Sequence, residues 1–213
     1  MSEQIDLLAY EKALNEQGVT LIAGVDEVGR GPLAGPVVAA AVILPKNAKL
    51  IGVDDSKKLT AKKREACYIQ ILEKALAVSV AEATVAEIEA INILQATKLA
   101  MKRAVEGLKI KPEYLLIDHL TLEVDMPQLN IVKGDAKSLS IAAASIVAKV
   151  VRDEAMKTLG KQYPAYAFEK NAGYGTEFHR LALQEHGYVE GVHRKSFEPI
   201  KSMLTTAKQA QLF

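Results

Sequence analysis

The chain has 213 residues, of which 49% are hydrophobic and 25% are charged; these values are near the averages of globular proteins and argue against intrinsic disorder. Lys and Arg number 27 and Asp and Glu number 26, so the net charge of +1 does not by itself indicate a polyanionic partner. The single cysteine, Cys67, excludes an intramolecular disulfide and a zinc site built from thiolates.

In chain order, the hydrophobic pattern predicts strands first, then strands alternating with helices, then helices alone. Apolar runs bounded by Gly, Pro or polar residues predict strands at 21–25, 37–44, 78–83, 114–118 and 129–132. Helical spacing and capping residues predict helices at 3–17, 61–76, 85–107, 138–159 and 176–186, with a last helix starting near Pro199. Strands in a hairpin are antiparallel and strands joined through a helix are parallel, so we expect an α/β fold on a five-stranded mixed sheet.

Two of these helices carry patterns that predict which side chains face inward. In the helix at 61–76 the inward residues would be Tyr68, Ile71, Leu72 and Ala75. In the helix at 85–107 one stripe would hold Ile88, Ile91, Leu94, Met101 and Val105. Cys67 is interpreted as a small core residue. We expect one main domain at 20–198, preceded by a helical segment at 1–19 and followed by a helix and tail at 199–213.

The location of the protein is suggested by what its segments lack. The first residues contain acids and no long apolar run, which is not the pattern of a secretory signal. No segment approaches the roughly 20 apolar residues of a membrane span. We therefore expect a cytoplasmic monomer that does not bind membranes.

Four acidic residues follow predicted strands. Asp26 and Glu27 end one strand, Asp118 ends another, and Asp135 lies just after a third. Ligands gather outside the carboxyl ends of strands in such sheets, and converging carboxylates call for hard divalent cations such as Mg²⁺ or Mn²⁺. Two such ions roughly 4 Å apart can activate water and stabilise a leaving oxygen in phosphoryl transfer. Any one of these acids alone is more often a turn former or a helix cap.

Asp26 and Glu27 raise a geometric difficulty. Alternation along a strand sends neighbouring side chains to opposite faces. Either the strand ends between these two residues, or Glu27 contributes partly through its backbone carbonyl.

Several motifs follow one another between residue 20 and about residue 197. They are Gly24-Val-Asp26-Glu27-Val-Gly29-Arg30-Gly31-Pro32-Leu-Ala-Gly35-Pro36, Asp54-Asp-Ser56-Lys57-Lys58-Leu-Thr60, Ile117-Asp118, Lys133-Gly134-Asp135-Ala-Lys137-Ser138 leading into Ile141–Val150, Asn171-Ala-Gly173-Tyr174-Gly175-Thr176 with His179, and His193-Arg194-Lys195-Ser196-Phe197. In this order they closely resemble the ribonuclease HII family. The related type HIII enzymes carry an extra N-terminal domain, and only about 20 residues precede the first predicted strand here.

The resemblance implies a ribonuclease H-like fold, with a helical C-terminal extension, and two Mn²⁺ or Mg²⁺ ions. The catalytic and metal-binding quartet would be Asp26, Glu27, Asp118 and Asp135, with Asp26 shared between the ions. The substrates would be RNA–DNA hybrids and DNA duplexes that contain ribonucleotides. Cleavage on the 5′ side of a ribonucleotide would leave a 3′-hydroxyl and a 5′-phosphate.

The resemblance also implies which residues contact the substrate. Main-chain groups of Gly29, Arg30 and Gly31 would read the 2′-hydroxyl, the group that distinguishes RNA from DNA. Tyr174 would stack on the adjoining deoxyribose. Lys57 and Lys58 would contact phosphates; they belong to a basic stretch at 46–64 with seven Lys or Arg and two Asp, which alone would be interpreted as a solvated surface.

Some residues keep open interpretations. His119 is interpreted as structural or as a bystander in proton transfer, and Lys137 and Lys149 either line the site or pack beside it. His179, His186 and His193 form no recognisable zinc set. The end of the chain, Gln209-Ala-Gln-Leu212-Phe213, resembles imperfectly the peptides that dock on bacterial sliding clamps, although a frayed terminus is the more common case.

Two other functions compete with this hypothesis. One is a junction resolvase or DNA endonuclease of the same fold superfamily, which would lack the Gly-Arg-Gly and tyrosine segments. The other is a non-catalytic module that binds RNA–DNA hybrids, which would have no need for clustered negative charge beside a phosphate backbone.

Overall fold

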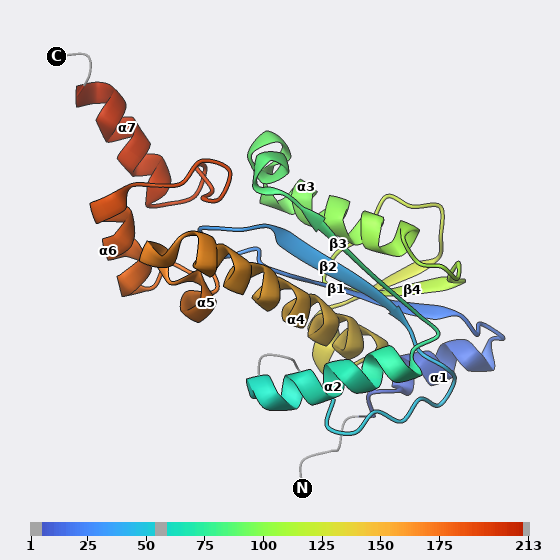
Figure 1. Cartoon of the computed structure of the whole chain (residues 1–213). Helices are drawn as coiled ribbons and strands as arrows, with labels where there is room; N and C mark the ends of the chain where they lie inside the picture. Colours follow the sequence, from blue (N-terminus) through green and yellow to red (C-terminus); the bar gives the residue numbers. More distant parts are fainter. Residues whose placement is uncertain (1–5, 54–58, 211–213) are drawn as a thin grey trace, which may run out of the picture. The chain divides into compact units, whose positions relative to one another are not determined.

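The computed structural model describes residues 6–53 and 59–210, with side chains up to residue 205. Its strands are β1 (Ile22–Val28), β2 (Val37–Ile43), β3 (Ala77–Ala83), β4 (Tyr114–Asp118) and β5 (Gln128–Ile131). Its helices are α1 (Ala9–Glu16), α2 (Ala61–Lys74), α3 (Val85–Glu106), η1 (Gly134–Ala136), α4 (Leu139–Gln162), η2 (Pro164–Tyr166), α5 (Phe168–Asn171), α6 (Glu177–His186) and α7 (Ile200–Ala210). Figure 1 shows how these elements follow one another along the chain.

The strands form one mixed sheet in the order β3-β2-β1-β4-β5. β1 pairs antiparallel with β2 and parallel with β4, and β4 pairs parallel with β5. The short link between β1 and β2 accounts for the antiparallel pair, and α3, between β3 and β4, is a helical crossover. The predicted five-stranded mixed sheet flanked by helices is confirmed.

The internal contacts of the chain divide it into two compact units. Among the described residues, the first unit contains 6–28, 38–53, 59–82 and 97–151, and therefore most of the sheet. The second contains 29–37, 83–96 and 152–210. Each unit has its own apolar cluster, so we describe each by itself.

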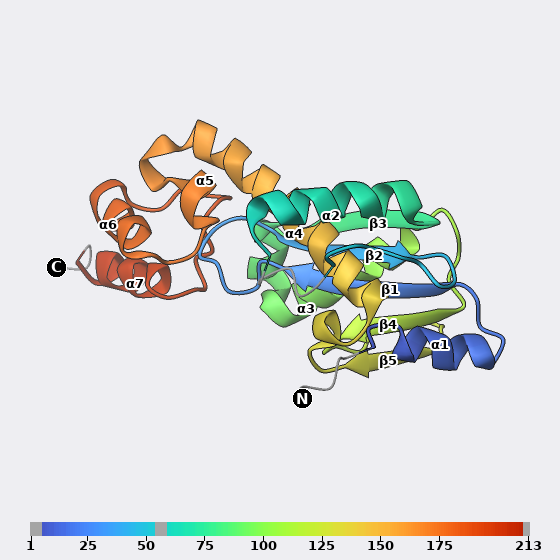
Figure 2. The same cartoon turned by 90° about the horizontal axis from the view of Figure 1, so that it is seen from below.

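The core of the first unit is built on both faces of the sheet. On one face, Ala40 and Val42 of β2 pack with Cys67 and Ile71 of α2 and with the small residues of α4. The second half of α3 lies on the other side of the sheet (Figure 1), where Met101 is fully buried. Figure 2 shows α1 beside β4 and β5, where a further cluster joins residues of these elements, including Leu14, Leu116 and Ile131.

The start of α4 is fixed by a buried carboxylate and a missing side chain. Glu11 of α1 accepts hydrogen bonds from the Ser138 hydroxyl (2.7 Å) and the Ser140 N–H (3.0 Å), which is a favourable place for an anion at a helix N-terminus. A Cβ on Gly24 of β1 would overlap the main chain of Ser140 and Ile141. The backbones of β1 and α4 therefore touch, and the helix lies directly over the strand that ends in the acids.

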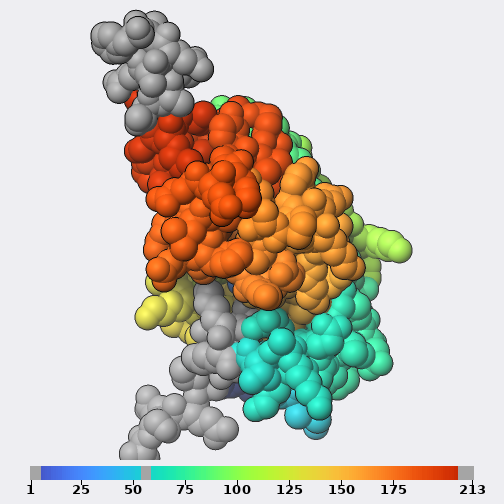
Figure 3. Space-filling model, turned by 60° about the vertical axis from the view of Figure 1, so that its left-hand side comes forward, coloured from blue at the N-terminus to red at the C-terminus, as the bar shows by residue number. Residues whose placement is uncertain are grey.

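The second unit has a core of aromatic and aliphatic side chains. Leu33, Met156, Tyr166, Phe168 and Leu183 are among its buried members. Figure 3 shows part of the outer surface of this unit, with the α5–α6 region in orange and α7 toward red. Thr176 accepts a hydrogen bond from the His179 N–H and Gly187 ends α6, as the capping pattern predicted.

Three predictions of inward-facing side chains are wrong. Leu72 is 47% exposed, because α2 buries Cys67 and Ile71 on a narrower face than expected. Ile91 and Leu94 are also exposed, at 39% and 40%. Asn92 between them has a φ of 66°, and its Oδ1 accepts from the N–H groups of Leu94 and Gln95. This internal cap restarts α3 and breaks the single stripe that the sequence suggested.

Other differences concern element boundaries and short elements. β1 extends through Asp26 and Glu27 to Val28, beyond the predicted end at Val25. The short helices η1, η2 and α5 were not predicted, because they are too brief to produce a periodic pattern. Over the described residues, no helix combines the length and the apolar character that crossing a membrane requires.

The contact between β1 and α4 yields a prediction about stability. Gly24→Ala places a methyl group against main-chain atoms that cannot rotate away, so we expect the free energy of unfolding to fall by about 3 kcal/mol. Chemical denaturation measures this change. Gly18→Ala is the matched control: its φ is +87° but the space is open, so its cost is about 1 kcal/mol. Equal losses in both variants would contradict the close packing.

Candidate metal centre

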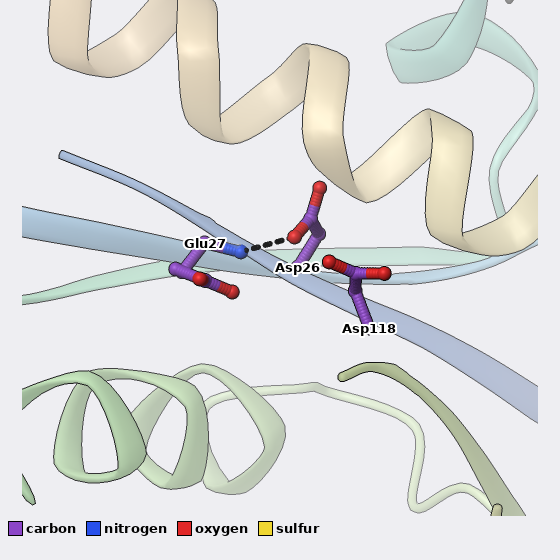
Figure 4. A group of neighbouring side chains, drawn as sticks. All are labelled: Asp26, Glu27 and Asp118. Carbon is purple, nitrogen blue, oxygen red and sulfur yellow. Dashed lines mark hydrogen bonds between the residues drawn. The ribbon is translucent and has the colours of Figure 1, made fainter. Parts of the chain in front are cut away.

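Two carboxylates stand at the same level on neighbouring parallel strands. Val25 of β1 is in register with Ile117 of β4, so the next residues along the strands, Asp26 and Asp118, emerge side by side on the same face. On the other side of β1, Asp26 is paired with Ala40 of β2. Figure 4 shows the two carboxylates close together beneath α4.

Glu27 reaches the same place by a different route. The strand does not end between Asp26 and Glu27, so the first of the two alternatives is wrong. The Glu27 side chain leaves β1 on the opposite side from Asp26 (Figure 4), as alternation requires. Even so, one carboxylate oxygen from each of Asp26, Glu27 and Asp118 lies within 4.8 Å of the other two. The Glu27 side chain thus brings its own carboxylate to the cluster.

Asp26 is the most deeply buried acid of the cluster, with an exposed fraction of 4%. Desolvation, followed by the negative charges of Glu27 and Asp118, raises the pKa of Asp26 well above its ordinary value. Two hydrogen bonds oppose this shift, one from the Ser145 side chain in α4 and one from the Glu27 N–H at 2.7 Å. These hydrogen bonds orient the carboxylate, while burial and the neighbouring acids raise its pKa.

Asp118 links the cluster to the fourth predicted acid. Its Oδ1 accepts a hydrogen bond of 2.6 Å from the N–H of Gly134, and Asp135 is the next residue, 6% exposed, in η1. The structure thus brings Asp26, Glu27 and Asp118 together. Asp135 lies one residue from a direct partner of the cluster but is not within the 4.8 Å set found among the described residues.

The donors of this cluster suit a hard divalent cation. All three are carboxylates, which are the ligands that Mg²⁺ and Mn²⁺ prefer, and their mutual repulsion is relieved by positive charge. Across 6–53 and 59–205, no other group of three or more His, Cys, Asp or Glu side chains has metal-binding spacing. His179, His186 and His193 form no such set among these residues.

The predicted sugar-reading segment, Gly29 to Gly31, lies in the second unit and is held by a buried arginine. Arg194 is 0% exposed and donates hydrogen bonds to the carbonyl oxygens of Gly29 (2.6 Å), Arg30 (3.0 Å) and Gly35 (2.8 Å). Its guanidinium also lies 5.1 Å from the centre of the Phe197 ring. Burial and the charge of the nearby Arg152 lower the pKa of Arg194 to about 9, so it remains charged near neutral pH.

Arg152 is the second buried arginine that binds the glycine-rich stretch at 29–36. It donates to the carbonyl oxygens of Ala34, Pro36 and Ala172, and its side chain fills the space that a Cβ on Gly29 would need. Gly29, with a φ of +98°, is therefore required by the fold itself. No role was predicted for Arg152 or Arg194 from the sequence; the available signal for Arg194 was its place in the His193–Phe197 motif.

Tyr174 lies against the exposed part of this segment. Its ring is 46% exposed, and a Cβ built on Gly31 would lie 3.6 Å from Tyr174 Cε1. Gly31 is itself exposed. In the second unit the exposed Gly31 therefore lies beside the exposed Tyr174, whereas Gly29 is buried and Arg30 is half-buried.

Other predicted contacts are placed only in part. Lys57 and Lys58 lie outside the described residues, as do residues 211–213 of the proposed clamp-binding tail. Lys137 is exposed two residues after Asp135, and Lys149 is half-buried in α4. His119 is exposed with a φ of 59°, immediately after the end of β4. The roles of these three side chains stay as the sequence analysis left them.

Comparisons with known proteins identify related chains. Residues 23–200 match the family model described as Ribonuclease HII. The ribonuclease HII of Geobacillus sp. (strain WCH70) is 54% identical over 206 residues, covering 97% of this chain and 74% of the relative. The crystal structure of ribonuclease H2 from Pyrococcus horikoshii OT3 is similar with a TM-score of 0.74 and 26% identity, covering 88% of this chain and 98% of that one.

Two further solved structures share the fold. One is the PCNA:RNase HII complex from Archaeoglobus fulgidus, with a TM-score of 0.69 and 24% identity over 83% of this chain and 95% of that one. The other is Bst-RNase HIII in complex with Mn²⁺, with a TM-score of 0.66 and 23% identity over 98% of this chain and 77% of that one. These likenesses confirm the ribonuclease H-like fold that the motifs implied.

The charge repulsion at Asp26 yields a prediction for Asp118→Asn. Because the folded-state pKa of Asp26 is raised, the stability due to its protonated form is complete below its ordinary value of 3.8 and is lost as pH rises through the raised pKa. At pH 7.5 in chelator, removing the charge of Asp118 should therefore raise Tm, by roughly 2–4 °C for each kcal/mol of relieved repulsion. Asn retains an oxygen that can accept from Gly134.

Thermal melts with chelator, Mg²⁺ and Mn²⁺ test this prediction. Divalent ions should raise the Tm of the unaltered protein and raise that of Asp118→Asn much less. Asp125→Asn, an exposed acid of the same unit, controls for net charge and should leave both responses unchanged. A lower Tm for Asp118→Asn than for the unaltered protein in chelator would contradict the interpretation.

Proposed function

The chain belongs to the ribonuclease HII family, and from this premise we propose that it cuts RNA–DNA hybrids and cuts 5′ to ribonucleotides embedded in duplex DNA. Family membership makes the protein an endonuclease of the ribonuclease H type. The observation that carries the proposal is the three-carboxylate cluster on β1 and β4, in a chain whose motifs match the family from 23 to 200. The cut would leave a 3′-hydroxyl and a 5′-phosphate.

We assign the cation ligands to Asp26, Glu27, Asp118 and Asp135. The proximity of the first three, and the bond from Gly134 to Asp118 that draws the Asp135 segment close, support this assignment. When bound, two Mg²⁺ or Mn²⁺ ions supply an activated water and stabilise the leaving oxygen. The Ser145 side chain and the Glu27 N–H hydrogen-bond the Asp26 carboxylate, which orients it and opposes the rise of its pKa.

Substrate selection is assigned to residues of the second unit and to two lysines. Main-chain groups of Gly29, Arg30 and Gly31 would meet the 2′-hydroxyl, and Tyr174 would stack on the following deoxyribose. The exposed Gly31 beside the exposed Tyr174 ring supports this assignment. Lys57 and Lys58 would bind phosphates, so affinity should fall as salt concentration rises.

The competing functions receive less support. A junction resolvase or a DNA endonuclease has no use for a glycine segment beside an exposed tyrosine. A non-catalytic hybrid-binding module would not retain three carboxylates within 4.8 Å of one another, because negative charge repels a phosphate backbone.

A cleavage assay tests the proposed reaction. The substrates are a DNA duplex with one ribonucleotide, a uniform RNA–DNA hybrid and an all-DNA four-way junction, each with Mg²⁺, Mn²⁺ or chelator. We expect cleavage of the first two with either cation, a cut on the 5′ side of the ribonucleotide, and no reaction with chelator.

Two substitutions of aspartate by asparagine test the role of the carboxylate cluster in the same assay. Asp118→Asn should reduce the rate by about 10³-fold, equivalent to roughly 4 kcal/mol of transition-state stabilisation, while hybrid binding is retained. Asp125→Asn should cleave normally. Cleavage of the all-DNA junction, or a normal rate for Asp118→Asn, would refute the proposal.

A protein partner is proposed for the C-terminal residues. A fold neighbour was solved as a PCNA:RNase HII complex, and the Gln209–Phe213 sequence resembles clamp-binding peptides. Gln209 and Ala210 of this sequence belong to α7, and its other residues lie outside the described part of the chain. A tethered enzyme would gain effective concentration at newly made DNA.

Deletion of residues 209–213 tests the partner. Binding to a bacterial sliding clamp, measured by surface plasmon resonance, should weaken at least tenfold, whereas cleavage of a short duplex without the clamp should not change. Equal clamp binding by both chains would refute this role of the tail.

A further inference from the structure

Two buried histidines form a continuous chain of hydrogen bonds in the second unit. The N–H of Val189 donates to Nδ1 of His193 at 2.9 Å. Nε2 of His193 lies 3.0 Å from Nε2 of His179, and Nδ1 of His179 lies 2.9 Å from the carbonyl oxygen of Tyr174. Both imidazoles are 0% exposed. The chain thus runs from a loop N–H, through two rings, to the backbone of the predicted substrate-stacking tyrosine.

The two ends of this chain fix the position of every proton in it. A backbone N–H only donates, so His193 Nδ1 accepts and the ring carries its proton on Nε2. A carbonyl oxygen only accepts, so His179 carries its proton on Nδ1 and its Nε2 accepts. The two deductions agree, because the His193 Nε2–H then donates to His179 Nε2. A proton added to either ring would place two donors against each other.

The surroundings of the pair favour the neutral rings. Tyr166 of η2 lies edge-on to His193 with 4.8 Å between ring centres, and Phe168 of α5 lies 5.4 Å from His179. The Tyr166 hydroxyl is used elsewhere, since it donates to the Gly187 carbonyl. Burial, followed by the neighbouring His179, lowers the pKa of His193 to about 4, and burial lowers that of His179.

The charged groups near the pair are directed elsewhere. Arg194, next along the chain, donates to main-chain carbonyls of the glycine-rich segment. Glu177 and Arg180 are exposed on α6, and Arg180 donates to the Gly175 carbonyl.

The same short segment also holds the glycine-rich backbone. His193 forms an isolated β-bridge with Ala34, and the Arg194 N–H donates to the Leu33 carbonyl at 2.8 Å. The Gly35 N–H donates to the Val192 carbonyl at 2.9 Å. Residues 192–194 are therefore bonded on one side to the segment that includes Gly29–Gly31 and on the other, through His179, to Tyr174.

We propose that His179 and His193 are positioning residues for the selection of RNA–DNA junctions: as a proton-ordered neutral pair they hold the Tyr174 backbone at a fixed place beside the Gly29–Gly31 segment. This inference rests on the proposed substrate roles of Tyr174 and of that segment. Neither histidine touches the substrate or a metal ion. Their effect is transmitted through the carbonyl of Tyr174, which accepts from the ring of His179.

The proton arrangement is directly measurable in the unaltered protein. Long-range ¹H–¹⁵N correlation NMR of ¹⁵N-histidine-labelled protein distinguishes the two neutral tautomers and the charged ring. We expect His179 as the Nδ1–H tautomer and His193 as the Nε2–H tautomer, with both rings neutral at pH 7. The exposed His186 is the internal comparison. An Nε2–H tautomer at His179, or a charged ring at pH 7, would overturn the inference whatever the substrate proves to be.

A matched pair of variants tests the functional part. His179→Asn keeps a side-chain N–H near the position of Nδ1, whereas His179→Leu removes the donor at similar size. The readout is junction preference, the kcat/KM on a duplex with one ribonucleotide divided by that on a uniform RNA–DNA hybrid. We expect His179→Leu to lower this ratio by about tenfold, His179→Asn to restore most of it, and His186→Leu to leave it unchanged.

A double-mutant cycle with Tyr174→Ala separates positioning from general instability. If His179 acts through Tyr174, His179→Leu lowers the junction preference no further when Tyr174 is already Ala. An unchanged preference in His179→Leu, or an additional loss in the Tyr174→Ala background, would overturn the inference. By contrast, if Tyr174→Ala itself keeps the full preference, the proposed role of Tyr174 fails. The Tm increase with Mn²⁺ should be the same in all variants, because its ligands lie in the other unit.

Discussion

The in-register pairing of β1 with β4 is the constraint on which the metal centre depends. Because Val25 and Ile117 are paired, the next residues, Asp26 and Asp118, emerge side by side. The distance between their backbones is fixed by the pairing of the strands and does not depend on side-chain rotation. The contact between Gly24 and the main chain of Ser140 then brings α4, with its Ser145, over the same carboxylate. Repulsion among the acids is thus imposed by the sheet, and a divalent cation bound there would relieve it. In a site of this kind, the same repulsion that lowers the stability of the metal-free protein raises its affinity for cations.

In the second unit the buried charges are positive and are bound by main-chain carbonyl groups. Arg152 and Arg194 are fully buried, and the bonds described for both run to main-chain carbonyls. A guanidinium has five donors in a rigid fork, so each arginine fixes several points of the backbone at once. The acids of the first unit repel one another, whereas the hydrogen bonds of these two cations run to carbonyl groups of the same unit. Their role is to hold the glycine-rich segment and its accessible Gly31 in one shape.

The histidine pair also fixes the backbone of the second unit, but with neutral side chains. Two imidazoles between a fixed donor and a fixed acceptor have one arrangement of protons that satisfies every bond, so the network is rigid only while both rings are uncharged. Arg152 and Arg194 hold the glycine-rich segment, and the histidine pair holds the backbone of Tyr174. Tyr174 and Gly31 themselves remain exposed.

The sequence alone determined much of this protein, because strand and helix periodicity, glycine stops and the motif order are local properties. They predicted the mixed sheet, most element boundaries and the acids of β1 and β4. The exposed Ile91 and Leu94 could not be predicted, since they follow from a positive φ at Asn92 within one apparent helix. Only the tertiary structure revealed that Glu27 reaches the cluster from the opposite face of β1, and that Arg194, His179 and His193 meet groups up to 165 residues away. Contacts of that kind depend on how distant segments pack, which no local pattern records.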